Sequence, residues 1–361
     1  PHAQEDDAEQ AVRAALALVD AVASIRTGVD ATLQARIGIA TGTVVVREVL
    51  IGETRSEQEV LGQTPNLAAR LQTLAEPGTV LICPTTHRLA GGYFDYCDLG
   101  PRALKGWEEP IVVWQVVRTS GVESRFEALH ATGLNVLVGR DEEFELLLRC
   151  WQRAKSGEGQ VVLLSGEAGI GKSRLAAALL EKLATEPHAR LRYFCSSQHT
   201  NSALYPIIAQ MERAAGLAQG DTPQARLDKL DAVLAQTSTS IEDAALFAEM
   251  LSLPNDGRYP ALDLTPEQRR QRTLNAFVLQ AQALTRSNPL LIIFEDAHWA
   301  DPTSLEVLSR VVDQIVALPA LLIVMFRPEF DPPWIGQPHV TALPINRLAQ
   351  RDVAAIVDHL V

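Results

Sequence analysis

Nine consecutive residues near the middle of the chain have the types and spacing of a phosphate-binding loop. They are, in order, Gly166, Glu167, Ala168, Gly169, Ile170, Gly171, Lys172, Ser173 and Arg174. The first eight fit the pattern GxxxxGK[ST], in which glycines let backbone N–H groups turn toward phosphate oxygens at the start of a helix. In this pattern Lys172 neutralises the β- and γ-phosphates and the Ser173 hydroxyl binds Mg²⁺. The segment therefore predicts a site for a nucleoside triphosphate with Mg²⁺, and we assign all nine residues to it.

A pair of carboxylates supplies the acidic group that such a loop requires. Glu295 and Asp296 follow the short apolar run Leu291 to Phe294, which is typical of a buried strand. One carboxylate can hold Mg²⁺ through water while the other orients the attacking water. The usual order of this motif puts Asp first, so the residue types leave open which carboxylate has which role. Asp301 and Pro302 then predict a helix start, with an N-cap residue followed by proline.

Closer to the N-terminus, Asn66 and Arg70 are four residues apart. This spacing places an amide and a guanidinium on one helix face. Arg70 can bind a phosphate through two parallel hydrogen bonds, or it can be an ordinary solvated arginine on a helix. The residue types alone leave both interpretations open.

The elements that must position these residues fall into two predicted units, 1–118 and 134–361, joined by a linker at 119–133 that lacks sustained periodicity. In the first unit, apolar periodicity and turn residues predict a mixed α/β arrangement. Its predicted strands are 35–40, 43–50, 79–82, 93–99 and 111–117, and its predicted helices start before Val12, at Thr64-Pro65 and after Pro84.

The second unit has short apolar runs without alternation at 160–165, 290–294 and 320–326. Such runs are typical of parallel strands that helices cover on both faces. We therefore predict a doubly wound parallel sheet, with a mostly helical insertion between Ser202 and Arg286.

The composition argues against several classes of protein. Of 361 residues, 47% are apolar and 21% are charged, which is typical of a soluble globular chain. No apolar run approaches the ~18 residues of a membrane span. The net charge of −12 argues against a large nucleic-acid surface. The four cysteines lie far apart without CxxC pairing, so we expect buried or half-buried thiols in a reducing cytoplasm.

On these motifs the second unit resembles the AAA/STAND signalling ATPases. The segment from Glu295 to Asp301, which contains Asp296 and His298, is similar to their Walker B element. The resemblance implies ATP and Mg²⁺ as cofactors, with Ser173, Glu295 and Asp296 on the metal and Asp296 in the catalytic set. We expect His298 to be a satisfied structural histidine rather than a catalytic one.

Two further segments extend this resemblance. Val138, Gly139 and Arg140 resemble the family's adenine-side entry motif, and Phe326-Arg327-Pro328 resembles its sensor position. The resemblance places Arg327 near the γ-phosphate as a catalytic residue, whereas taken alone Arg327 is equally well a surface cation. The family's lid begins about where this chain ends (347–361), so we expect the lid arginine and the winged helix to be missing.

Three segments of the first unit resemble the second half of a class III adenylyl or guanylyl cyclase domain, a ferredoxin-like α+β fold. They are Arg36 to Gly42, Val60 to Leu71 and Leu104 to Gly106. The resemblance implies that Asn66 and Arg70 stabilise the transition state in which the 3′-oxygen attacks the α-phosphate, and that Lys105 contacts the triphosphate. The sequence departs from the family at Arg47-Glu48, which replaces Gly-Asp, and at Pro65, which replaces Val.

The same resemblance places two metal-binding aspartates and a purine-contacting lysine before Pro1. We therefore expect a fragment that forms no cyclic nucleotide, whereas its parent protein forms it. The pairing of the two units is similar to the soluble, bicarbonate-type adenylyl cyclases and their bacterial relatives. It implies a cytoplasmic homodimer through the cyclase unit and an unknown protein effector, without membrane or nucleic-acid partners.

Two functional hypotheses result. In the first, the chain belongs to a cyclase that converts ATP to cAMP and pyrophosphate under the control of the attached ATPase. In the alternative, ATP and ADP select between two conformations of a switch or assembly module whose cyclase-like part only docks partners. The N-terminal pattern disfavours a housekeeping ATPase. Under either hypothesis we expect Lys172 to face solvent before nucleotide binds, so that Lys172→Ala removes ATP binding with little loss of fold.

Overall fold

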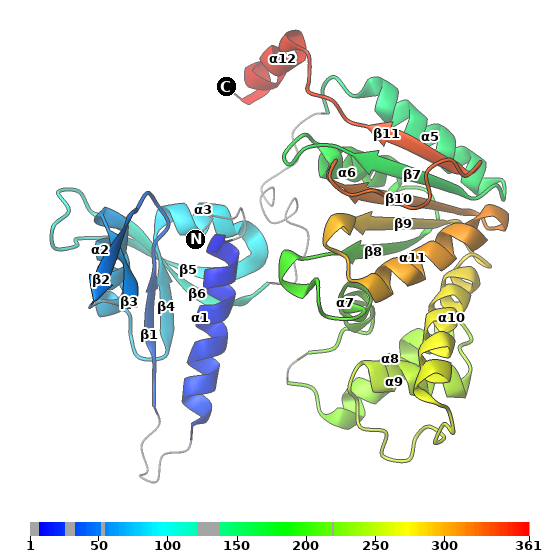
Figure 1. Ribbon diagram of the computed structural model, residues 1–361, viewed down its shortest axis with the longest axis horizontal. Helices are drawn as coiled ribbons and strands as arrows, with labels where there is room; N and C mark the ends of the chain where they lie inside the picture. Colours follow the sequence, from blue (N-terminus) through cyan, green and yellow to red (C-terminus); the bar gives the residue numbers. More distant parts are fainter. Residues whose placement is uncertain (1–6, 26–32, 52–54, 121–136, 219, 361) are drawn as a thin grey trace. The chain divides into compact units, whose positions relative to one another are not determined.

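The computed structural model describes residues 7–25, 33–51, 55–120, 137–218 and 220–360. The chain forms two compact units, Pro1–Leu134 and Asn135–Val361 (Figure 1). Of the predicted linker at 119–133, only residues 119 and 120 lie within the described ranges, and Thr119 ends a strand.

A four-stranded sheet forms the centre of the first unit. In spatial order its strands are β1 (Arg36–Ile39), β4 (Thr79–Ile82), β6 (Ile111–Thr119) and β5 (Phe94–Arg102). β1 is parallel to β4, and the other neighbours are antiparallel. The helices are α1 (Asp7–Ser24), α2 (Gln63–Leu74) and α3 (Pro84–Ala90). This α+β arrangement agrees with the predicted fold class.

Strand β4 explains how helices cover both faces of this sheet. Successive side chains of a strand point to opposite faces. Val80 and Ile82 pack in a cluster with Val12 of α1. Leu81, between them, packs with Leu71 of α2 in a second cluster. Burial on both faces therefore fixes α1 and α2 on opposite sides of the sheet.

A separate antiparallel ribbon pairs β2 (Val45–Ile51) with β3 (Arg55–Leu61). Strand β2 was predicted to start at Thr43, two residues early, and β3 was not predicted. The residues of β3, RSEQEVL, are mostly polar and carry no apolar run. Their strand conformation comes from pairing with β2, a contact that local propensity does not report.

Gly38 of β1 sets how closely α2 approaches the sheet. A Cβ atom on this residue would lie 2.3 Å from both the carbonyl oxygen of Ala68 and the amide nitrogen of Gln72 in α2.

We expect Gly38→Ala to push α2 outward, because both obstacles are backbone atoms that cannot turn away. The expected cost is about 2 kcal/mol, seen as roughly 30-fold faster hydrogen exchange of the α2 amides. Gly220→Ala is the control, because a Cβ there meets nothing within 4 Å; unchanged exchange in Gly38→Ala would contradict the expectation.

The second unit is built on a five-stranded sheet in which all neighbours are parallel. In spatial order its strands are β11 (Val340–Pro344), β7 (Gln160–Ser165), β10 (Ala320–Phe326), β9 (Leu290–Glu295) and β8 (Ala189–Phe194). The predicted doubly wound sheet is confirmed. The bounds of β7 and β10 match the predicted runs, whereas β8 and β11 were not predicted, because neither carries a fully apolar run.

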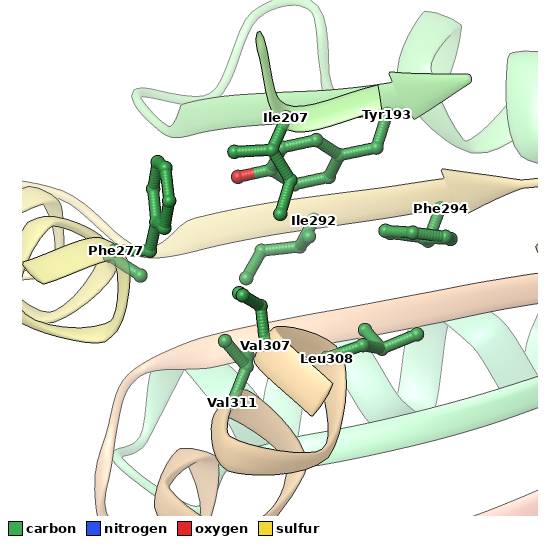
Figure 2. Close-up of a pocket in the computed structure, with 9 residues that line it drawn as sticks. Tyr193, Ile207, Phe277, Ile292, Phe294, Val307, Leu308 and Val311 are labelled. Atoms are coloured by element: carbon green, nitrogen blue, oxygen red, sulfur yellow. The ribbon is translucent and has the colours of Figure 1, made fainter. Parts of the chain in front are cut away.

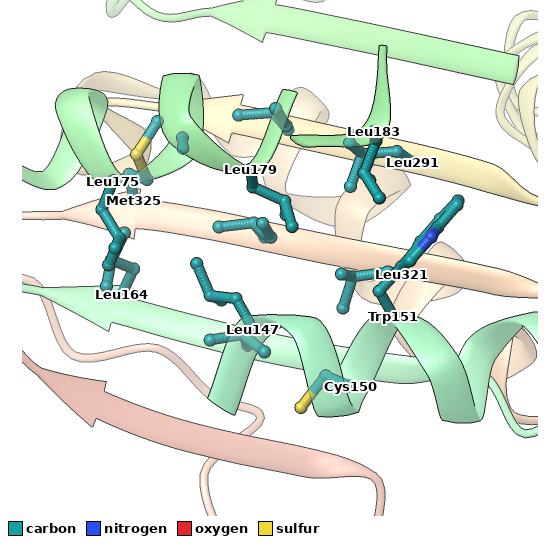
Figure 3. Packing of buried hydrophobic residues seen from close by; sticks show 14 of the residues in the cluster. Leu147, Cys150, Trp151, Leu164, Leu175, Leu179, Leu183, Leu291, Leu321 and Met325 are labelled. Atoms are coloured by element: carbon teal, nitrogen blue, oxygen red, sulfur yellow. The ribbon is translucent and has the colours of Figure 1, made fainter. Parts of the chain in front are cut away.

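Helices bury both faces of this sheet. Along β7, Val162 and Leu164 pack on one side and Val161 and Leu163 on the other. The first side is covered by α5 (Asp141–Lys155) and α6 (Lys172–Leu183), as Figure 3 shows around Trp151. The second side is covered by α10 (Pro266–Leu284) and α11 (Pro302–Gln314). Burial on two faces is why these strands read as continuous apolar runs.

The predicted helical insertion is confirmed, and it forms its own apolar cluster with α10 and α11. Its other helices are α7 (Tyr205–Ala214), α8 (Pro223–Gln236) and α9 (Ile241–Met250). Where the insertion meets the sheet, apolar side chains including Tyr193, Phe277 and Val307 line a cavity of about 20 Å³ (Figure 2). This volume holds about one water molecule, so the cavity is a packing gap rather than a nucleotide site.

Two statements from composition can be compared with the structure. Cys83, Cys150 and Cys195 are buried and free, as expected, but Cys97 is exposed on β5. Cys97 lies between two register irregularities of β5, where two consecutive residues are exposed, and the spacing of cysteines does not indicate this. Among the described helices, none is both long and apolar enough to cross a membrane.

Candidate nucleotide site

The predicted site residues of the second unit meet at one edge of the sheet. The strand registers pair Ser165 with Phe326, and Glu295 with Phe194. Parallel strands end at the same edge, so three chain segments leave the sheet together there. These segments are the loop that starts at Gly166, the acidic pair at Glu295 and the residues from Arg327 onward. The Gly166 amide also donates to the Phe326 carbonyl at 3.3 Å.

The loop between β7 and α6, which the sequence predicts to bind phosphate, turns at two glycines. Gly169 and Gly171 have φ values of 74° and 108°, a region that favours glycine. A Cβ atom on either residue would meet nothing within 4 Å, so backbone conformation rather than crowding requires glycine here. Helix α6 begins at Lys172, directly after Gly171. Its first amides are therefore available to an anion at the helix N-terminus.

Lys172 contradicts the expectation that it faces solvent. Its side chain is buried, with 9% of the residue exposed. The ammonium nitrogen donates to the carbonyl oxygens of Gly166 and Glu167 at 2.7 and 2.9 Å. A buried ammonium needs hydrogen-bond acceptors, and the loop carbonyls supply two of them. Lys172 therefore contributes to the fold of the loop as well as to its charge.

Ser173 and Glu295 form the part of the site that suits a metal. The Ser173 hydroxyl donates to Glu295 Oε2 at 3.4 Å, which joins the loop to the end of β9. A hydroxyl and a carboxylate are the hard oxygen donors that Mg²⁺ prefers. Among the described residues there is no group of three or more His, Cys, Asp and Glu side chains that could hold a metal. The protein donors thus fit a Mg²⁺ ion that keeps several water and phosphate ligands, as Mg²⁺ usually does.

Glu295 has a second partner that the sequence analysis missed. Its Oε1 accepts from Arg192 Nη2 at 2.6 Å, and both side chains are largely buried. Arg192 lies on β8, the neighbouring strand, with its Cζ 4.9 Å from the centre of the Phe194 ring. The Arg192 carbonyl accepts from Arg213 of α7 at 2.9 Å. The signal that the sequence offered was a cation, Arg192, in the segment that forms β8. Its pairing with Glu295 becomes evident only when the order of the strands in the sheet is known.

We expect Arg192→Met to destabilise the second unit by about 3 kcal/mol, because it leaves the Glu295 carboxylate buried without this partner. Thermal unfolding measures the loss. Arg190→Met is the matched control, since Arg190 lies on the same strand but is exposed, and its change should stay within about 0.5 kcal/mol. Equal stability of the two variants would show that the ion pair contributes nothing to folding.

His298 is not the satisfied structural histidine that we expected. Both ring nitrogens are buried, and neither has a hydrogen-bond partner among the described residues. Burial, helped by the positive charges of Arg327 and Lys172 and opposed by Glu329, lowers the pKa of His298 to about 4. The imidazole is therefore neutral near pH 7.

Arg327 is not an isolated surface cation. Its guanidinium carbon lies 5.1 Å from the centre of the Trp299 ring, and that ring lies 4.5 Å from the imidazole of His298. Asp296 precedes this group in a left-handed conformation, with φ of 55°. The acidic pair, the imidazole and the guanidinium thus belong to one local group at the sheet edge.

The predicted N-cap at Asp301 is confirmed, and it has an additional role. Its Oδ1 accepts from the amides of Thr303 and Ser304 at 3.0 Å, which caps α11. The same oxygen accepts from the amide of Leu204 at 3.2 Å, which precedes α7. Asp301 therefore ties the insertion to the segment that carries the acidic pair.

The remaining predicted residues of this unit lie around the loop. Arg140 is buried and its Nη2 donates to the carbonyls of Ile170, in the loop, and Asn346, after β11. Gly139 has φ of 66° and lies beside Asp352 of α12 (Gln350–Leu360). Glu167 and Arg174 form ion pairs near the loop, with Arg347 at 2.9 Å and Glu181 at 3.3 Å, respectively. Arg140 thus contacts the loop that contains Ala168, and Val138 and Gly139 directly precede Arg140 in the chain.

In the first unit, Asn66 and Arg70 lie exposed on α2, and Lys105 lies exposed in the turn between β5 and β6. Their neighbours pack in one apolar cluster that contains Leu71 of α2 and Leu104 of the turn. Three polar side chains from two distant segments therefore border the same cluster and remain open to a ligand. Within the described residues, these three side chains have no partner that fixes their orientation.

Known protein families match both units. The AAA ATPase domain model matches residues 136–324, and the adenylate and guanylate cyclase catalytic domain model matches residues 1–118. An uncharacterized protein of Rhizobium meliloti (strain 1021) is 29% identical over 346 residues, which are 95% of this chain and 33% of that protein. The putative adenylate cyclase 3 of the same organism is 30% identical over 111 residues, which are 30% of this chain and 17% of that protein. The chain thus spans a third or less of the length of these relatives.

Solved structures of cyclases are similar to about a third of the chain, and two of them are an adenylyl cyclase and a guanylate cyclase domain. The adenylyl cyclase CyaB from P. aeruginosa is 28% identical, with 34% of this chain and 65% of that chain covered and a TM-score of 0.31. The guanylate cyclase domain of RhGC from Catenaria anguillulae, in complex with GTP, is 23% identical, with 33% and 64% covered and a TM-score of 0.31.

Proposed function

Since this chain belongs to the AAA ATPase family, we propose that it binds ATP with Mg²⁺ at residues 166–173 and that this binding controls a class III cyclase that forms cAMP. The observation that carries the proposal is the meeting of Lys172, Ser173 and Glu295 at one sheet edge. An ammonium, a hydroxyl and a carboxylate in this order are what a triphosphate with its metal requires.

Each of five site residues in the second unit has a proposed role. Lys172 exchanges its two loop carbonyls for oxygens of the β- and γ-phosphates, and the loop amides bind the same phosphates. Ser173 and Glu295 hold the metal side, because the Ser173 hydroxyl reaches Glu295 Oε2. Asp296, the next residue, orients the attacking water, and Arg327 stabilises charge on the γ-phosphate. Mg²⁺, when bound, neutralises charge on the β- and γ-phosphates.

In the whole protein, the first unit contributes to cyclisation. The 3′-oxygen of ATP attacks the α-phosphorus, the bond from that phosphorus to the β-phosphate oxygen breaks, and pyrophosphate leaves. Asn66 and Arg70 stabilise the charge that develops on the α-phosphate, while Lys105 binds the departing phosphates. Exposure of all three on one monomer suits a site completed by a second copy of the cyclase unit. This supports, as a proposal, the homodimer that the resemblance implies.

Isothermal calorimetry of the chain with MgATP tests the proposed nucleotide site. We expect saturable binding with one nucleotide per chain at the loop. A flat titration with both MgATP and MgADP would rule out the proposed function.

For the cyclase role, we expect Arg70→Ala in the whole protein to slow cAMP formation about 100-fold, because one charge-assisted contact to the transition state is lost. The rate of cAMP formation at saturating ATP measures the effect. Arg88→Ala is the control, since Arg88 is an exposed arginine on α3. An equal rate in wild type and Arg70→Ala would remove Arg70 from the active site.

A second candidate is the ATP/ADP-dependent switch without cyclisation. Two contacts favour it: Arg213 of α7 donates to the Arg192 carbonyl, and Asp301 accepts from the Leu204 amide. Both connect the nucleotide edge to the helical insertion. Absence of cAMP formation by the whole protein, together with a nucleotide-dependent change in the protease sensitivity of α7, would favour the switch.

A further inference from the structure

His298 is a half-buried residue whose two ring nitrogens are covered by protein atoms. Neither Nδ1 nor Nε2 has a hydrogen-bond partner among the residues that the structure describes. Native proteins rarely leave buried polar atoms unpaired, and an exception calls for a missing partner. Other histidines of the same unit have one: His188 Nδ1 lies 2.8 Å from the Glu186 carbonyl, and His339 Nε2 lies 2.9 Å from the Val312 carbonyl.

The surroundings of His298 indicate what the missing partner is. The residue follows the acidic pair by two positions and lies in a short 3₁₀ turn, Ala297–Trp299, at the sheet edge that holds the loop. Lys172 and Arg327 are close enough for their charges to act on its ring. These are the two cations that the proposed function assigns to the terminal phosphates. An anion between them would lie within reach of the same imidazole.

The chemistry of a neutral imidazole suits this partner. A neutral imidazole ring has one N–H donor and one nitrogen acceptor. The N–H can donate to a phosphate oxygen without adding a third buried positive charge to Lys172 and Arg327. Lys172 and Arg327 already supply the positive charge beside the phosphate. A hydrogen bond from His298 therefore fixes the direction of the contact rather than adding charge.

We propose that His298 donates a hydrogen bond to the γ-phosphate and thereby makes the site distinguish ATP from ADP. This inference rests on the proposed nucleotide site and adds a specificity-determining residue to it. Because protein atoms cover both nitrogens, the ring must turn or the 3₁₀ turn must shift when ATP enters. Asp296 precedes this turn in a strained left-handed conformation, which is where such a shift is expected. Only ATP gains this contact, so only ATP favours the shifted form.

The test compares the affinities of His298→Phe and His298→Gln for MgATP and MgADP by calorimetry. Phenylalanine keeps the ring shape without a donor, whereas glutamine keeps an N–H donor. We expect His298→Phe to weaken ATP about 10- to 30-fold and to change ADP less than about twofold, which corresponds to one hydrogen bond to a charged group. We expect His298→Gln to keep the ratio of ATP affinity to ADP affinity (the ATP-to-ADP ratio) within about threefold of wild type. His188→Phe is the control and should leave the ratio unchanged.

A structural role predicts a different result. If His298 only fills space, phenylalanine removes two unpaired nitrogens, so the nucleotide-free protein melts higher and the ATP-to-ADP ratio stays at the wild-type value. That result would overturn the inference while leaving the nucleotide site intact. If His298→Phe does not fold, the comparison is made between His298→Gln, which keeps a donor, and His298→Leu, which has none. Equal ATP-to-ADP affinity ratios in those two variants would also overturn the inference. Wild-type protein that binds neither nucleotide would instead refute the proposed function itself.

Discussion

Replacing Lys172 by alanine is expected to weaken MgATP binding about 1000-fold. The ammonium would make two charge-assisted hydrogen bonds to the β- and γ-phosphates, worth about 2 kcal/mol each, and about 4 kcal/mol corresponds to three powers of ten in affinity. Calorimetry or competition with a fluorescent nucleotide measures the change. Lys182→Ala is the matched control, because Lys182 lies exposed on the same helix and should leave the affinity unchanged.

The same substitution is also expected to reduce stability, which corrects the view that it leaves the fold untouched. The ammonium donates hydrogen bonds to the carbonyls of Gly166 and Glu167 in the folded loop. Alanine removes this donor from both, so we expect a loss of about 1–2 kcal/mol and a lower melting temperature. Affinity must therefore be measured well below that temperature. An affinity within threefold of wild type in a folded Lys172→Ala protein would contradict the assignment of the loop.

Exchanging the two carboxylates for amides is expected to separate their roles. We expect Asp296→Asn to slow single-turnover ATP hydrolysis about 1000-fold while ATP affinity stays within threefold, because an amide cannot accept the proton of the attacking water. Glu295→Gln should instead abolish most of the gain in ATP affinity that Mg²⁺ provides. The reason is that Glu295 accepts the hydrogen bond of the Ser173 hydroxyl.

The readouts for this pair are ATP affinity with and without Mg²⁺ and the single-turnover rate. Asp313→Asn on α11 serves as the control, since this carboxylate is exposed. The opposite pattern, with Asp296→Asn losing the effect of Mg²⁺ and Glu295→Gln keeping it, would reverse the assignment. The order Glu-Asp alone left this question open, and the hydrogen bond from Ser173 is what favours one answer.

Sequence patterns predicted the parts of the fold that are determined locally. Strands β7 and β10 were predicted to the residue, because burial on both faces demands an uninterrupted apolar run. The loop glycines were recognised because their backbone angles exclude most other residues. The cap at Asp301 was recognised because aspartate followed by proline is typical of the N-cap and first residue of a helix.

What depends on contacts between distant segments could not be predicted. Strand β3 is polar and exists through its pairing with β2. The partner of Glu295 is Arg192, 103 residues earlier, and only the neighbouring positions of β8 and β9 bring them together. The burial of Lys172 and the unpaired nitrogens of His298 likewise depend on how the loop and the 3₁₀ turn pack. A motif gives the types of residue in a site, whereas the sheet order gives their partners.

A crystal structure of the chain with Mg²⁺ and a non-hydrolysable ATP analogue would test the central claim most directly. The account predicts β- and γ-phosphate oxygens within hydrogen-bond distance of the amides at Gly169 to Gly171. It also predicts that the Lys172 ammonium has left the Gly166 and Glu167 carbonyls for those oxygens. A nucleotide bound elsewhere, or a Lys172 that keeps both carbonyl bonds beside a bound triphosphate, would contradict it.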